Sequence, residues 1–154
     1  MKNIEARVSD HPFLRSLTPE HLEIATKNAT DAEYEPDQIL FREGEPANRF
    51  FLIESGRVAI EWRSPEGRTL RVQTLGAGEV VGWSWMFPPF CWHFQARAVE
   101  PTHMLVLDGA HLLVTAEDDP KFGYDLMRRI SQILIDRLQA SRKKGIESDR
   151  PAKE

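Results

Sequence analysis

The chain has 154 residues, the length of a single globular domain that buries a core of its own. Its 20 Lys and Arg against 24 Asp and Glu give a net charge of -4, so we expect no basic surface for nucleic acid or for an anionic membrane. A single cysteine, Cys91, excludes an internal disulfide framework. The polar N-terminus, MKNIEARVSDHPF, and the lack of an apolar run near about 20 residues predict a soluble cytoplasmic protein.

The first predicted helix follows Leu17, because Thr18 is a good capping residue and Pro19 suits the first helical turn. We expect this helix over residues 18–28. Short extended segments separated by Gly and Pro then run from residue 32 to residue 107, and this even spacing predicts an antiparallel barrel or sandwich. The predicted strands are residues 39–41, 49–54, 58–62, 69–74 and 102–107. Gly44, Gly56 and Gly78 fall where strands must reverse, which glycine allows without steric cost.

Helical periodicity replaces the extended pattern after residue 107. Asp108 caps a short helix expected over residues 109–116, and Asp119-Pro120 starts a longer helix expected over residues 119–144, with Gly145 as its stop. One domain is therefore expected over residues 1–146, followed by a disordered tail over residues 147–154.

Apolar residues form a wide stripe along the long helix. One part of such a stripe packs against the domain, and its remaining width predicts a second copy of the helix in a homodimer. The residues of this candidate dimer helix are Leu126, Met127, Ile130, Ile133, Leu134 and Leu138.

Two motifs of the extended region are similar to a known family. Residues 41–58 read FREGEPANRFFLIESGRV and residues 75–82 read LGAGEVVG, with helices predicted on both sides. Over about residues 11–144 the chain resembles the cyclic-nucleotide-binding domain of the catabolite activator and Fnr regulators. The resemblance implies a mainly β fold, an eight-stranded antiparallel β-roll related to jelly rolls and cupins, with an N-terminal helix and a long C-terminal helix. In that family the long helix forms the dimer and responds to the ligand.

The aromatic segment GWSWMFPPFCWHFQARA, residues 82–98, falls where this family binds the cyclic phosphate. The resemblance places a ribose-binding Glu directly after the glycine that corresponds to Gly82, and a phosphate-binding Arg about ten residues later. Those positions hold Trp83 and, in our alignment, Trp92. A buried phosphate without its cation is unfavourable, so the sequence predicts no ordinary binding of cyclic AMP or cyclic GMP.

Three interpretations of this segment remain open. The rings fill the former pocket, or they line a new pocket for a less charged small-molecule effector, or a cyclic nucleotide binds through a different arginine, which would be Arg97, Arg71 or Arg68. Regular strand alternation would place Trp92, Phe94 and Ala96 on one face and Arg97 on the other. The residues of the candidate pocket are Val81, Gly82, Trp83, Ser84, Trp85, Trp92, His93, Phe94, Arg97 and Arg71.

The sequence predicts no catalytic site, no metal site and no cofactor. The histidines are dispersed, and only His93 and His103 would be neighbours in a cupin-like metal enzyme, which is the least favoured alternative. About ten residues follow the long helix, too few for a recognition helix, so we expect no direct contact with nucleic acid. The preferred hypothesis is a regulatory domain that signals to an unknown protein partner, with the hinge at residues 108–119 reseating the long helix.

Overall fold

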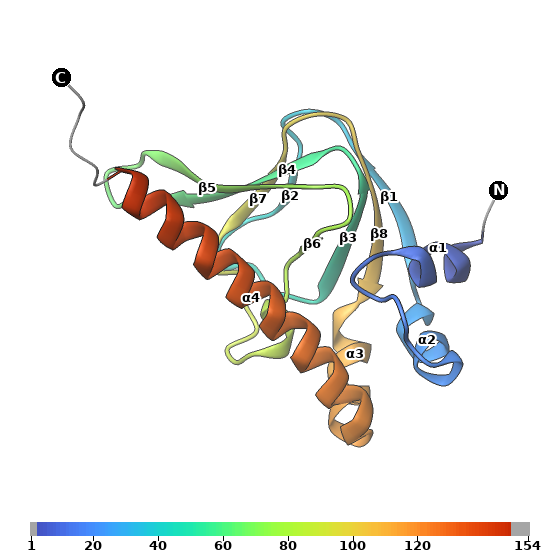
Figure 1. The fold of residues 1–154 in the computed structure, drawn as a ribbon. Helices are drawn as coiled ribbons and strands as arrows, with labels where there is room; N and C mark the ends of the chain where they lie inside the picture. The colour runs from blue at the N-terminus through green and yellow to red at the C-terminus, as the bar shows by residue number, and fades with distance from the viewer. Residues whose placement is uncertain (1–2, 149–154) are drawn as a thin grey trace.

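The described residues form an eight-stranded roll with helices before the first strand and after the last one. The computed structural model describes residues 3–148, and for residues 144–148 the backbone alone. Two four-stranded antiparallel sheets have the orders β1-β8-β3-β6 and β2-β7-β4-β5 (Figure 1), which confirms the predicted β-roll. The strands are β1 (Thr30–Tyr34), β2 (Ile39–Phe41), β3 (Arg49–Ser55), β4 (Arg57–Arg63), β5 (Thr69–Gly76), β6 (Val80–Val81), β7 (Gln95–Ala98) and β8 (Thr102–Asp108).

Within residues 3–148, four α-helices and one short 3₁₀ helix surround the roll. They are α1 (Ile4–Asp10), α2 (Pro19–Thr26), the 3₁₀ helix η1 (Ser84–Met86), α3 (Gly109–Asp118) and α4 (Pro120–Ser148). The sequence prediction missed α1, whose start is capped by the Asn3 side chain through the amide of Ala6 at 2.8 Å. None of the described helices is both long and apolar enough to cross a membrane.

The predicted caps of the other helices are present. Thr18 Oγ1 accepts a hydrogen bond from the His21 amide at 3.2 Å, and Asp108 Oδ1 accepts one from the His111 amide at 3.1 Å. Each cap satisfies a backbone donor that has no partner within its helix, which fixes where α2 and α3 begin.

The end of the long helix was predicted wrongly. α4 continues to Ser148, past Gly145 and into the segment expected to be disordered. A glycine inside a helix costs only about 1 kcal/mol, and the residues after it, Ile146 and Glu147, are compatible with a helix. Residues 149–154 of the expected tail lie outside the described residues.

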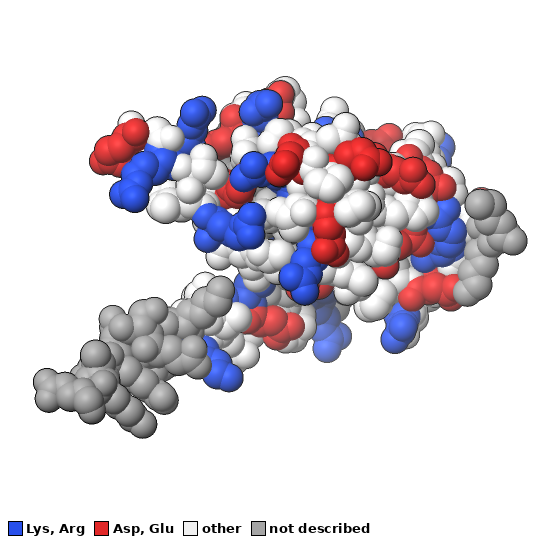
Figure 2. All heavy atoms as spheres, turned by 90° about the horizontal axis from the view of Figure 1, so that it is seen from above, with Lys and Arg blue, Asp and Glu red and all other residues white. Residues whose placement is uncertain are grey.

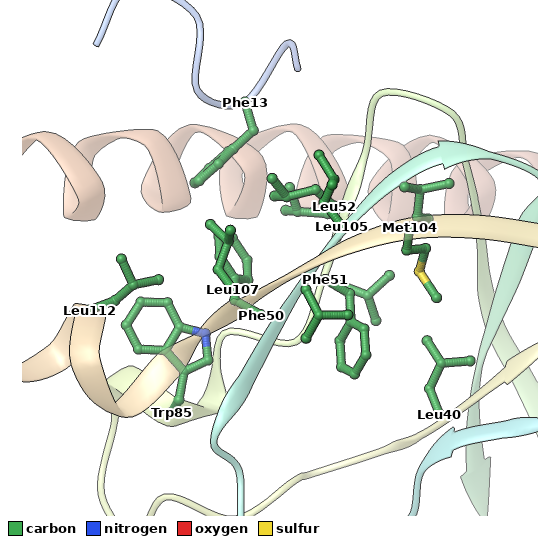
Figure 3. Packing of buried hydrophobic residues seen from close by; sticks show 14 of the residues in the cluster. Phe13, Leu40, Phe50, Phe51, Leu52, Trp85, Met104, Leu105, Leu107 and Leu112 are labelled. Carbon is green, nitrogen blue, oxygen red and sulfur yellow. The ribbon is translucent and has the colours of Figure 1, made fainter. Parts of the chain in front are cut away.

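Strand β3 is buried on both faces, which defines two packed layers of the core (Figure 3). Phe51 points into the roll, where its ring lies 5.9 Å from that of Phe41 in the second sheet. Phe50 points toward the helical side and contacts the rings of Phe13 and Trp85 at centroid distances of 5.2 and 5.4 Å. The helices therefore cover one face of the β1-β8-β3-β6 sheet, and the other sheet covers its second face.

Positive and negative side chains are interspersed on the face of the molecule drawn in Figure 2. No continuous basic area forms on that face, in agreement with the even distribution of charge along the sequence.

Candidate functional site

An aromatic cavity of about 280 Å³ lies between the second sheet, the segment around η1 and helix α4. We call it the aromatic cavity. Buried Phe41 and Trp92 form its floor, while Val72, His93 and Phe94 are exposed at its rim. Its remaining lining residues are Ile60, Gln73, Gly82, Trp83, Ser84 and Arg137.

Trp92 is fixed in the floor by three kinds of contact. Its ring stacks on Phe41 with a centroid distance of 3.8 Å and an interplanar angle of 15°. Its backbone amide and carbonyl bond to Glu45 and Gly44 at 3.0 and 2.8 Å. Gly82 lies against the same ring, and a Cβ at this position would come within 2.7 Å of it. Only a glycine, with its φ of +84°, therefore fits below the indole.

The wall of the aromatic cavity contains a cation that sequence analysis did not predict. Arg137, on α4, lies over the Trp83 ring at 4.5 Å from its centroid and donates a hydrogen bond to the Val80 carbonyl at 2.8 Å. Burial lowers the pKa of Arg137 to about 10, an effect that the negative charge of Glu79 partly opposes. Arg137 lies four residues after Ile133 and seven after Ile130, so helical periodicity places it on the same buried face of α4. This spacing could have identified Arg137 from the sequence.

Polar groups are few in this cavity. Ser84 Oγ and His93 Nδ1 lie 3.3 Å apart, so a hydrogen bond joins the start of η1 to the segment before β7. The Gln73 side chain belongs to the lining from β5. The arrangement is a mainly apolar cavity with one arginine and three other polar side chains, which is typical of small-molecule sites.

Six of the ten predicted pocket residues come together in this cavity, namely Gly82, Trp83, Ser84, Trp92, His93 and Phe94. Val81 and Trp85 are instead buried in the core. Arg97 pairs with buried Glu61 and with Asp37, on the face of the sheet opposite the cavity. Arg71 is exposed on β5 opposite Glu61 and is also outside the lining.

The expected strand alternation through Trp92 does not occur, because β7 begins only at Gln95. Residues 91 and 92 pair with the loop before β3 instead, through the Pro46–Cys91 bridge and the Trp92 hydrogen bonds. Trp92 is consequently buried while Phe94 is exposed, and His93 lines the same cavity as both.

A sequence profile of the cyclic nucleotide-binding domain matches residues 32–119, more than half of the chain. The chain belongs to the cyclic nucleotide-binding domain family.

Relatives of this cyclic nucleotide-binding domain occur in larger proteins. The CRP-like cAMP-activated global transcriptional regulator of Mycobacterium tuberculosis is 25% identical over 122 residues, 79% of this chain and 54% of the regulator. Acetyltransferase Pat of Mycolicibacterium smegmatis is 35% identical over 81 residues, 51% of this chain and 24% of the enzyme. The chain thus spans about half the length of the regulator and a quarter of the acetyltransferase.

Solved structures share the fold of this cyclic nucleotide-binding domain. A protein from Geobacter metallireducens superposes with a TM-score of 0.80 at 23% identity, covering 89% of this chain and 99% of that one. The sensor domain of the transcriptional regulator DNR from Pseudomonas aeruginosa has a TM-score of 0.71 at 21% identity, covering 88% and 91%.

The histidines of the domain do not form the pair that a cupin-like metal site would need. His93 lies beside Ser84 at the aromatic cavity, whereas His103 contacts Asp31 at 2.9 Å on the opposite sheet. Asp31, Glu54 and His103 bring potential ligand atoms within 4.8 Å of one another. The Arg7 guanidinium already binds both of these carboxylates, so a side chain of the domain itself compensates part of their charge.

Proposed function

We propose that this cyclic nucleotide-binding domain is a non-enzymatic regulatory domain that senses a small-molecule effector other than cyclic AMP or cyclic GMP. The aromatic cavity is the effector site, and helix α4 carries the signal to a protein partner. The observation that carries this proposal is the packing of Trp92 between Phe41 and Gly82.

The indole of Trp92 occupies the space directly above Gly82, where the family resemblance places the cyclic phosphate. Trp83 stands at the position of the ribose-binding Glu, and its ring is engaged by Arg137. A cyclic phosphate placed there would meet an indole and lose the cation that compensates its charge, which is unfavourable by several kcal/mol.

The aromatic side chains fill part of the aromatic cavity and leave room for a ligand in the rest. Phe41 and Trp92 close the floor, yet about 280 Å³ remains between them and the rim. This volume is near the lower end of the roughly 300–1,000 Å³ of small-molecule sites, so the effector is compact.

A continuous path of contacts leads from the cavity to the helices. Trp83 and Ser84 line the cavity, and the next residue, Trp85, is buried against Gly109, the first residue of α3. α3 then meets α4 closely at Gly123, where a Cβ would come within 2.5 Å of the Ala116 carbonyl oxygen. A ligand that moves the Trp83 segment therefore biases the seating of α4, both through α3 and directly through Arg137.

The second face of α4 is suited to a homodimer. Leu126, Ile130 and Ile133 pack on the domain, while a different side of the same helix exposes apolar residues. We call this set the exposed stripe; it consists of Tyr124, Met127, Leu134, Ile135 and Leu138. Three members of the predicted dimer helix, Met127, Leu134 and Leu138, belong to it, and residues one helical turn apart align along one side.

A cavity-filling variant with a matched control tests this function. Thermal unfolding and tryptophan fluorescence are measured with millimolar cyclic AMP, cyclic GMP and a library of compact metabolites. We expect no shift with either nucleotide and a stabilising shift with a library member, because a ligand of the native state alone raises its stability. Val72→Trp fills the rim and should abolish the shift. Thr74→Trp should retain it, because Thr74 is exposed, pairs with Ala59 beyond the irregularity in the β4–β5 register, and does not line the cavity. Binding of cyclic AMP to the wild type but not to Val72→Trp would refute the proposal.

A second candidate function has one observation in its favour. Arg137 supplies a cation at the aromatic cavity, although from α4 and not from the segment of the family's phosphate contact. A cyclic nucleotide sensor with an inverted pose would use it, and the nucleotide arms of the same experiment detect such a sensor.

A further inference from the structure

Arg137 is a partly buried cation without a carboxylate partner among the described residues. Arg7, Arg97 and Arg129 differ from it, since each of these three arginines pairs with an Asp or Glu. The Arg137 guanidinium has five N–H donors, and the structure gives it one acceptor in the described region, the Val80 carbonyl. A partly buried guanidinium with free N–H donors can bind an anion, because anionic oxygens accept the hydrogen bonds that the domain itself does not make.

The surroundings of Arg137 restrict the anion. Six of the lining residues are apolar, namely Phe41, Ile60, Val72, Trp83, Trp92 and Phe94. Aromatic faces favour a flat ring, which stacks on or meets the edge of Trp and Phe. A single cation compensates a single negative charge, and a dianion would leave one charge unpaired in an apolar site.

We infer that the effector of the aromatic cavity is a compact aromatic carboxylate whose anionic group binds Arg137 and whose ring lies among Trp83, Trp92 and Phe94. The inference rests on the proposed function and specifies its ligand class. A carboxylate accepts two parallel hydrogen bonds from a guanidinium, so it fits the fork that Arg137 presents. Because Arg137 belongs to α4, the bound carboxylate would tie this helix to the cavity wall.

The first test compares ligands on the wild-type chain by calorimetry and thermal unfolding. The probes are benzoate, phenylacetate, the neutral isostere benzamide, and cyclic AMP. We expect both carboxylates to bind and to raise the unfolding midpoint, with benzamide at least about tenfold weaker because it cannot form the charged pair. Equal affinity for benzamide and benzoate would overturn the inference. So would the lack of any binding of the carboxylates at 10 mM, a ligand concentration about tenfold above a millimolar Kd.

The second test removes the cation. Arg137→Gln should weaken the binding of the carboxylates at least about tenfold, and Arg137→Lys should retain part of it as a point charge. Arg142→Gln, an exposed arginine of the same helix, is the matched control and should bind as the wild type does. Unchanged affinity in a folded Arg137→Gln variant contradicts the inference. If that variant does not fold, Arg137→Lys and the benzamide comparison still decide the question.

The outcomes separate this inference from the proposed function. Binding of a neutral compound that is lost in Val72→Trp would leave the sensor function standing and exclude the carboxylate class. Binding of cyclic AMP without binding of the carboxylates would exclude both.

Discussion

At the scale of single residues, the aromatic cavity depends on the packing of one ring against one glycine. Trp92 lies between Phe41 and Gly82, so its position sets both the floor of the cavity and the conformation of the segment that follows β6. Gly82 has a φ of +84° and no space for a side chain. Backbone strain and steric clash can be tested separately, because Gly67 has the same φ of +84° and a Cβ there would meet no atom within 4 Å.

Gly82→Ala should therefore destabilise the domain by roughly 2–4 kcal/mol, the sum of backbone strain and overpacking against the indole. Gly67→Ala should cost only about 1 kcal/mol, because it introduces strain without a clash. Urea unfolding of both variants measures the difference. Equal losses of stability in the two variants would show that the Trp92 ring can move aside to accommodate a Cβ at residue 82.

At the scale of elements, α4 has two functions that its sequence combines in one wide stripe. Leu126 and Ile130 are almost fully buried and belong to the core, and Arg137 continues the same face to the aromatic cavity. The exposed stripe lies on another side, where Leu138 is 63% exposed. A helix of 3.6 residues per turn separates these faces, so substitutions can test one without disturbing the other.

Leu134→Glu with Leu138→Glu should dissociate the proposed homodimer. Each substitution occurs in both protomers, so four leucine side chains leave the interface. At about 1.5 kcal/mol each, their loss raises the dissociation constant by at least about 100-fold, before the repulsion between the new charges is added. Light scattering after gel filtration measures the mass and so the oligomeric state. The free energy of unfolding of the monomer, from thermal unfolding, should change by less than about 1 kcal/mol. Gln139→Glu makes the same kind of charge change off the stripe and should leave the dimer intact; a double variant that remains dimeric would place the interface elsewhere.

At the scale of the whole molecule, an ionic cluster ties the N-terminal helix to the roll. Arg7 of α1 binds Asp31 of β1 and Glu54 of β3, and His103 of β8 donates a hydrogen bond to the Asp31 carboxylate at 2.9 Å. The three strands are neighbours in one sheet, so a single guanidinium holds α1 across all of them. Hydrogen bonds from Arg7 lower the pKa of Asp31 to about 2 and raise that of Arg7.

This cluster predicts how stability depends on pH. Because the folded pKa of Asp31 is about 2 and its ordinary value is 3.8, its contribution is fully present above about pH 4 and is lost as pH falls toward 2. Asp31→Asn should therefore reduce the loss of stability between pH 4 and pH 2, measured by urea unfolding across that window. Its half-exposed side chain keeps the effect small. Glu33→Gln, on the same strand, is the control; an equal change in both variants would deny Asp31 a special role.

The sequence by itself determined the architecture and the place of the site. The architecture follows from local patterns, namely the even spacing of turn residues, the caps Thr18 and Asp108, and the apolar stripe of α4. Such patterns can be read from the sequence because they depend on backbone propensity and on the periodicity of helices and strands. The same information placed the candidate pocket in residues 82–98, and Gly82, Trp83, Ser84 and Trp92 do line one cavity. The prediction failed for α1 and for the end of α4, where weak local preferences are decided by the rest of the molecule.

Only the tertiary structure decided which side chains meet in that cavity. Trp92 is held by the loop at Gly44 and Glu45, and this long-range pairing replaces the strand alternation that would have grouped it with Phe94 on one face. Arg97 pairs with buried Glu61 on the opposite face of the sheet. Arg137, which lies 45 residues after Trp92 in the sequence, lines the cavity from α4. Contacts between segments this far apart depend on how sheets and helices pack. Helical periodicity can place Arg137 on the buried face of α4, but it cannot place Arg137 against Trp83.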